Sequence, residues 1–152
     1  CSNLALTSLP SGITSIGGSA FYYCTGLALT SLPSGIKRIE YQTFLSCTNL
    51  SLTSLPEGVT SIGSYAFQNC KSLALTSLPE SANMIEGNAF RGCTGLTEIT
   101  FEGTPKTLSS SAFQGCTNIT TIRVPWAEGE VAGAPWGASN ASLIYAYTPE
   151  TA

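Results

Sequence analysis

The sequence predicts a solenoid, mostly β, in which short parallel strands stack coil on coil and short helical turns lie on the opposite side. The 152-residue chain has six cysteines at a constant spacing of 23 residues, namely Cys1, Cys24, Cys47, Cys70, Cys93 and Cys116. A column of phenylalanines keeps the same step, at Phe21, Phe44, Phe67, Phe90 and Phe113. No insertion interrupts either column. A fixed period in the low twenties is typical of a solenoid, because one such unit cannot bury its apolar face alone.

The elements within a unit follow in chain order, and we number the units 1 to 6 from their cysteines. "LTSLP" predicts a short strand that ends at Pro, because Pro cannot donate to a sheet ladder. "LPSG" (residues 9–12) fits a type I turn with Pro second and Gly fourth. "ITSI" (13–16) predicts a second short extended segment. "GSAFYYC" (18–24) places Ala20, Phe21 and Cys24 at helical spacing behind a capping Ser, which predicts a short helical turn.

Units 1 to 4 differ from units 5 and 6 in the first strand. Threonine fills the column that Ile99 and Ile122 occupy later, and a leucine stands one place earlier, at Leu6, Leu29, Leu52 and Leu75. A one-residue shift moves a side chain to the other face of a strand. Either the leucines form an exposed apolar ridge that could bind a partner, or a local bulge turns them inward. The sequence leaves both interpretations open, with the bulge slightly favoured because buried threonines need hydrogen-bond partners.

The cysteines and phenylalanines are predicted to fill the core. Equivalent residues of stacked strands lie ~4.8 Å or more apart and point the same way, whereas a disulfide needs Cβ atoms within roughly 3.5–4.5 Å. We therefore expect Cys24, Cys47, Cys70 and Cys93 to be buried thiols rather than bridged pairs. The spacing contains no C-x-x-C pair, which argues against a zinc site. Cys1 would be exposed at the first coil.

The segments "LPSGITSIGGSAFYYC" (9–24) and "LPEGVTSIGSYAFQNC" (55–70) resemble the BspA-type leucine-rich repeats of bacterial and some protist surface proteins. The resemblance implies a leucine-rich repeat solenoid, an α/β-class horseshoe. We expect the array to occupy residues 1–125. A C-terminal capping segment would follow at 126–152, where Trp126 and Trp136 cover the last coil. The pattern starts in phase at Cys1, so we expect a preceding part in a longer protein, and the uncapped N-terminal coil makes an end-to-end dimer plausible.

The composition argues against catalysis and against several kinds of partner. The chain has no histidine and no aspartate, which removes the commonest general base and the commonest metal ligand. With a net charge of −3 and no basic run, no nucleic-acid partner is expected. No apolar run approaches the ~18 residues that a membrane span requires, so no membrane insertion is expected. We predict no enzyme activity, no cofactor and no metal.

A binding surface is the best functional interpretation. The candidate binding residues are the four leucines above, the polar strand residues Ser31 and Ser54, and Tyr23, Tyr41 and Tyr65 at the variable coil edges. Tyrosine offers large contact area at low entropic cost. The resemblance implies a protein-binding or adhesion module, extracellular or at a bacterial cell surface, with a protein or glycan ligand. A structural spacer, or an accessory domain of a larger secreted enzyme, stands as the alternative.

Overall fold

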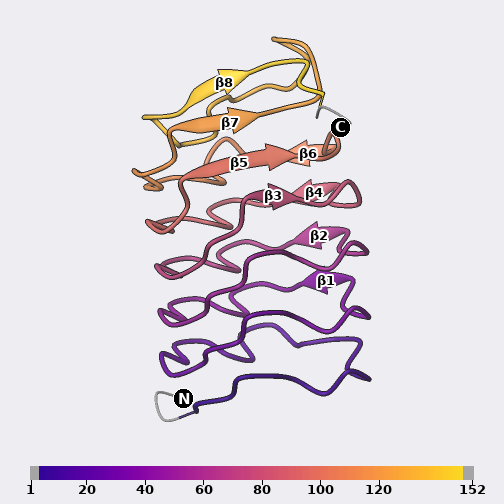
Figure 1. Cartoon of the computed structure of the whole chain (residues 1–152), viewed down its shortest axis with the longest axis vertical. Coiled ribbons are helices and arrows are strands. Elements are labelled where there is room, and N and C mark those ends of the chain that lie inside the picture. The colour runs from indigo at the N-terminus through magenta and orange to yellow at the C-terminus, as the bar shows by residue number, and fades with distance from the viewer. Residues whose placement is uncertain (1–3, 149–152) are drawn as a thin grey trace.

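The computed structural model shows a parallel-strand β-solenoid, and residues 4–148 are described here. Figure 1 shows the coils stacked in sequence order along one axis, with the first described coil at one end of the stack and the strand at residues 142–144 near the other. Each coil contributes short extended segments joined by turns. The predicted solenoid is therefore confirmed.

The strands form two four-stranded sheets in which every paired strand is parallel. One sheet has the order β1-β2-β4-β6, with β1 at Arg38–Ile39, β2 at Ser61–Ile62, β4 at Met84–Ile85 and β6 at Thr107–Leu108. The other has the order β3-β5-β7-β8, with β3 at Ser77–Leu78, β5 at Glu98–Phe101, β7 at Thr121–Arg123 and β8 at Ser142–Ile144. Their register repeats the period of the sequence, since Ile39 pairs with Ile62 and Ile62 with Ile85.

Proline explains why the "LTSLP" strand is absent from units 1 to 3. In unit 5, the amide of Glu102 donates to the carbonyl oxygen of Leu78 at 3.1 Å and closes the ladder. The equivalent residue in units 2 to 4 is Pro33, Pro56 or Pro79, which has no amide hydrogen to donate. The prediction of a strand in this segment is therefore wrong for units 1 to 3, and in unit 4 the strand covers only Ser77–Leu78 of the segment.

The prediction of short helical turns is wrong, because the described residues contain no helix. Residues 17–24 instead form successive turns, in which the amides of Ala20, Tyr22 and Cys24 each donate to the carbonyl three residues earlier. The amides between them donate to the next coil, as Phe21 does to Thr43 at 2.9 Å. An α-helix uses its amides internally and is about 10–12 Å wide, so it could not stack at the spacing of these coils.

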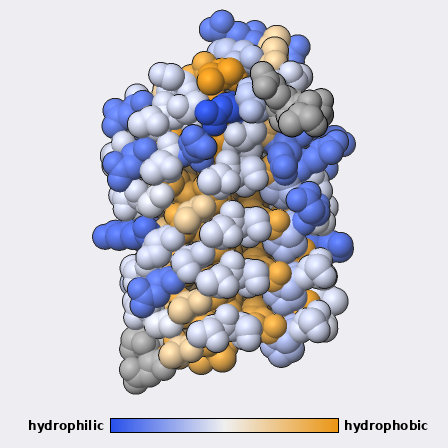
Figure 2. All heavy atoms as spheres, viewed as in Figure 1, coloured by the Kyte–Doolittle hydropathy of each residue, from blue (hydrophilic) through white to orange (hydrophobic). Residues whose placement is uncertain are grey.

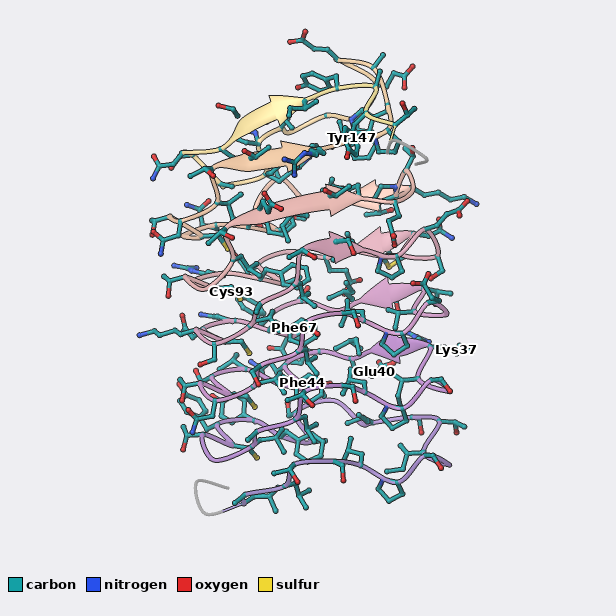
Figure 3. The ribbon with its side chains drawn as sticks, viewed as in Figure 1. Lys37, Glu40, Phe44, Phe67, Cys93 and Tyr147 are labelled. Atoms are coloured by element: carbon teal, nitrogen blue, oxygen red, sulfur yellow. The ribbon has the colours of Figure 1, made fainter. Side chains whose placement is uncertain are left out.

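The core is a continuous stack of aromatic rings beside a column of cysteines. Phe44, Phe67, Phe90 and Phe113 are fully buried, and successive rings lie 5.3–5.4 Å apart, with interplanar angles of 4–11°. Figure 3 shows Phe44 and Phe67 one above the other inside the coils. Phe21 continues the stack at 5.6 Å from Phe44 but is only half-buried. The solenoid therefore has one core that runs along its axis rather than a separate core in each unit.

Residues 126–147 continue the same stack. Trp136 takes the next place in the phenylalanine column, and its carbonyl accepts from the amide of Phe113 at 2.8 Å. Its ring lies 5.8 Å from that of Trp126, and both indoles are buried. β8 pairs with β7 in the same sheet. That this segment is a cap separate from an array ending at residue 125 stays a prediction.

Candidate functional site

The strongest candidate site lies along the sheet that contains β1, β2 and β4. A hollow of about 320 Å³, here the first hollow, lies between residues 14–18 of unit 1 and Lys37, Arg38 and Glu40 of unit 2. A second hollow of about 120 Å³ continues across Tyr41, Ser61 and Gly63 to Met84 and Glu86. Arg38 and Glu40 line both hollows. The two hollows therefore form one concave track over successive coils, and Figure 3 shows Lys37 at the edge of the coil with Glu40 nearer its middle.

Charged groups line this track. The Nε of Arg38 lies 3.2 Å from Oε1 of Glu40, and the Arg38 side chain is largely exposed. Farther along, Oε2 of Glu86 accepts a hydrogen bond from the amide of Ser64 at 3.2 Å. Lys37 forms no ion pair with any described residue. The first hollow consequently carries an unpaired positive charge, whereas the second ends at a carboxylate.

Four tyrosines cluster beside the track, and we call Tyr22, Tyr23, Tyr41 and Tyr65 the tyrosine group. The rings of Tyr22 and Tyr23 lie 4.5 Å apart, and those of Tyr41 and Tyr65 lie 6.1 Å apart. Tyr22, Tyr23 and Tyr41 are exposed by 41–53%. The pKa of Tyr22 is raised by loss of hydration first and then by Tyr23, with a smaller effect from Tyr41. Tyr22 was absent from the predicted site, although its position next to Tyr23 was a usable signal.

Two of these tyrosines occupy strained backbone positions. Tyr23 has a φ of 56° and Tyr65 a φ of 59°. The same column as Tyr23 holds Ser46, Asn69, Gly92 and Gly115 in later units, all with positive φ. Small or amide residues tolerate this conformation, whereas for a bulky residue it is an outlier. Positive φ therefore belongs to the repeat, and the tyrosines differ from the later units in the bulk of their side chains. Their exposed rings make the tyrosine group the strongest functional signal among the described residues.

Of the two alternatives left open for the leucine column, the structure shows the inward-facing one for three of its four members, so these three are not surface binding residues. Leu29 and Leu52 are completely buried and Leu75 is 1% exposed, while Thr30, Thr53 and Thr76 face outward. Burial of one leucine per coil removes far more apolar area from water than burial of the threonine would. Leu6, in the first described coil, is 38% exposed.

The serine column remains on the surface. Ser31 and Ser54 are exposed and lie on the coil face that carries β3, β5, β7 and β8 farther along. Figure 2 shows this face as columns of pale, intermediate side chains with apolar surface between them and hydrophilic residues at the sides. Such a face has hydroxyl groups but few charges, so it offers less to distinguish one ligand from another than the track does.

The structure buries the predicted core cysteines. Cys47, Cys70 and Cys93 are free and buried, as is Cys116. Burial raises the pKa of the Cys47 thiol to about 11 and holds the pKa of Cys70 and Cys93 well above the usual range. Cys47, Cys70 and Cys93 are therefore poor nucleophiles, because the thiolate is the reactive form.

Cys24 corrects the prediction that no cysteine is bridged. It is completely buried, but its sulfur is disulfide-bonded. The argument from the distance between Cβ atoms applies to a cysteine held between two stacked coils. It does not extend to the cysteines of the first coils. Cys1, which we expected to be exposed, lies outside the described residues.

The described residues offer little to catalysis. Within residues 4–148, no group of three or more histidine, cysteine or acidic side chains could hold a metal ion. The same part of the chain contains no helix that is long and apolar enough to cross a membrane. Glu98 pairs with Arg123 at 3.5 Å. The pKa of Glu102 is raised by partial loss of hydration and then by Glu57 and Glu80.

Comparisons with known proteins identify similar repeats. The family model described as BspA type leucine rich repeat region matches residues 1–120 in six copies. A leucine-rich repeat protein from Bacteroides ovatus is 29% identical over 76% of this chain, with a TM-score of 0.67. A leucine-rich repeat protein from T. pallidum is 33% identical over 82% of this chain, with a TM-score of 0.69. The chain spans 30% and 60% of these two structures, respectively. No curated protein sequence matches the chain.

Proposed function

We propose, from the premise that this chain belongs to the BspA-type leucine-rich repeat family, that it is a non-catalytic module that binds a protein. The observation that carries the proposal is the tyrosine group beside the concave track. Three of its members are exposed. Tyrosine is enriched at the energetically important positions of protein interfaces.

We also propose that the module acts outside a bacterial cell or on its surface, where it contributes to adhesion. The family is typical of such proteins, and the sequence resemblance led to the same expectation. The exposed tyrosine rings suit a protein ligand better than the serine column does, because tyrosine is enriched at protein interfaces and serine is depleted there.

The test is a binding measurement on immobilised extracellular-matrix proteins and glycans with the wild-type chain and two variants. Tyr23→Asn and Tyr41→Ser install residue types that the same columns already hold at Asn69 and Ser64. We expect each variant to weaken binding of the protein ligand at least tenfold. Tyr23→Asn is also expected to leave the unfolding midpoint unchanged or higher, because Asn tolerates positive φ.

The matched control is Arg91→Gln, which changes an exposed residue in the column of Tyr22, three coils along. It should bind as the wild type does. If the tyrosine variants bind as tightly as the wild-type chain, the interface lies elsewhere on the solenoid. A flat response of the wild-type chain to every protein and glycan would instead favour the structural spacer, which the continuous ring stack along the axis also supports.

We further propose that the first coil supports end-to-end self-association. Leu4, Leu9, Ile13 and Phe21 are only half-buried there, whereas the equivalents of Phe21 in later coils are completely buried. Sedimentation at increasing protein concentration should then show a dimer, and Phe21→Ser should shift it toward monomer. A single monomeric species at all concentrations would reject this part of the proposal.

A further inference from the structure

The ladder of the β1-β2-β4-β6 sheet is interrupted on the outer side of β1. Between later units, backbone hydrogen bonds follow the repeat: Gly63 donates to Ile39 at 2.7 Å, Glu86 to Ile62 at 3.0 Å and Ser109 to Ile85 at 3.0 Å. The equivalent bond from Glu40 to Ile16 is missing. Among the described residues, no backbone hydrogen bond joins 13–17 to 37–40. β1 is therefore an edge strand, although a coil lies beyond it.

The interruption is local. Unit 1 is bonded to unit 2 on both sides of it, by Ser19 donating to Tyr41 at 2.9 Å and Ala28 donating to Leu6 at 3.0 Å. The first hollow fills the place between them and is lined by residues 14–18, Lys37, Arg38 and Glu40. At about 320 Å³, it reaches the size at which ligand pockets begin, roughly 300 Å³.

The backbone that borders the first hollow can pair with another chain. In a parallel ladder, alternate residues direct their amide and carbonyl groups to opposite neighbours. The carbonyl of Ile39 accepts from Gly63 and so faces β2, which turns the amides of Arg38 and Glu40 toward the first hollow. Unpaired edge groups of this kind are the template on which an extended peptide adds as a strand.

The charges at the first hollow favour an acidic side chain in a peptide that binds there. Lys37 and Arg38 line it together with one carboxylate, Glu40, which pairs with Arg38 at 3.2 Å. Lys37 is exposed and forms no ion pair with a described residue. The chain as a whole carries a net charge of −3, so this positive spot contrasts with its surroundings. An acidic side chain next to Lys37 would complete the charge pattern.

We propose that the first hollow binds an extended segment of a partner protein, which pairs with the outer edge of β1 and places an acidic side chain at Lys37. The inference rests on the proposed protein-binding function and names the chemistry of its ligand. The tyrosine group then contacts the partner beside this segment.

The test uses a bead-displayed library of random linear heptapeptides selected on the full chain. The selected peptides should be enriched in Asp or Glu at one position, and Lys37→Glu should weaken their binding at least tenfold. Lys106→Glu is the matched control, because Lys106 occupies the same column of the repeat as Lys37. At Lys106 the strand ladder is complete, since the amide of the next residue, Thr107, donates to the carbonyl of Asn83. N-methylation of alternate peptide amides should also reduce binding, since it blocks strand pairing.

Amide hydrogen exchange provides the second readout. The amide of Glu40 should exchange freely in the unbound chain and become protected when the best peptide is added. The amide of Glu86, which is bonded to Ile62, should be protected in both states. Failure to enrich peptides, enrichment without an acidic position, or an unchanged Glu40 amide overturns the inference.

Two further outcomes separate this inference from the proposed function. If uronic-acid oligosaccharides protect Glu40 and peptides do not, the first hollow is a carboxylate-glycan site and the peptide inference is wrong. If a protein ligand binds in a tyrosine-dependent way and Lys37→Glu has no effect, the proposed function holds and only the inference about the first hollow fails.

Discussion

Each phenylalanine carbonyl in the middle of the core accepts two hydrogen bonds. The oxygen of Phe44 accepts from the amide of Cys47 and from the thiol of Cys70, both at 3.0 Å. The thiols of Cys93 and Cys116 repeat the arrangement with Phe67 and Phe90. Cysteine is therefore more than a small apolar filler here, because its sulfur satisfies a buried carbonyl of the preceding coil.

These thiols predict a loss of stability at alkaline pH. Burial raises the pKa of Cys47 to about 11, whereas a thiol in the unfolded chain titrates near 8.5. The unfolded state releases its protons first, so stability is complete below about pH 8.5 and falls as the pH rises toward 11. Thermal unfolding midpoints measured over this range should decrease.

Cys47→Ala serves as the matched variant for that measurement. It removes one of the titrating thiols, so its midpoint should fall less steeply between the same pH values than that of the wild-type chain. Parallel slopes would show that Cys47 does not contribute to the alkaline loss.

At the scale of the element, the turns between the strands depend on residues held at positive φ. The residue before each cysteine adopts this conformation in five successive units, at Tyr23, Ser46, Asn69, Gly92 and Gly115. Each turn thereby reverses direction within a few residues, which a helical turn would not do. The tyrosine group lies on these same turns, so the local strain and the candidate interface belong to one element.

Glycine substitutions test the geometry of the turns. Gly115 has a φ of 76°, and a Cβ there would meet only ordinary contacts at 3.5 Å and beyond. Gly115→Ala should therefore lower the free energy of unfolding by about 1–2 kcal/mol through backbone strain alone. Gly12→Ala, at a glycine with open space around it and no positive φ, should be neutral or stabilising by up to about 1 kcal/mol. Urea unfolding of the two variants measures the difference, and equal effects would contradict the turn assignment.

The sequence predicted the columns well and the local backbone poorly. Phe44, Phe67 and the buried cysteines follow directly from the period, because core positions repeat with the coil. The spacing of Ala20, Phe21 and Cys24 did not distinguish a helix from successive turns, since both bring residues three apart to one side. The first hollow was beyond prediction, because it arises from one missing set of hydrogen bonds between units of nearly the same sequence.

At the scale of the whole molecule, every strand pair among the described residues joins neighbouring coils. Strand pairs connect consecutive coils with a step of 23 residues through the array, as in Ser77 with Thr100. Stability should then be a sum of terms for single units and for adjacent pairs.

Deletion of a whole unit tests this additivity. Removal of residues 48–70 joins Cys47 to Lys71 and keeps every column in phase. The shortened chain should retain a cooperative unfolding transition and the same circular dichroism per residue, with a lower midpoint. Deletion of residues 48–59 breaks the phase and should abolish the transition. If both deletions behave alike, the coils are not exchangeable units.

Both tryptophans of the chain, Trp126 and Trp136, are buried at the C-terminal end of the stack. Indole fluorescence will therefore follow the opening of that end, while circular dichroism averages over all coils. In a chain with only neighbour contacts, the two signals need not change at the same temperature. The difference between the unfolding midpoints from fluorescence and from circular dichroism would measure how many coils open as one cooperative block.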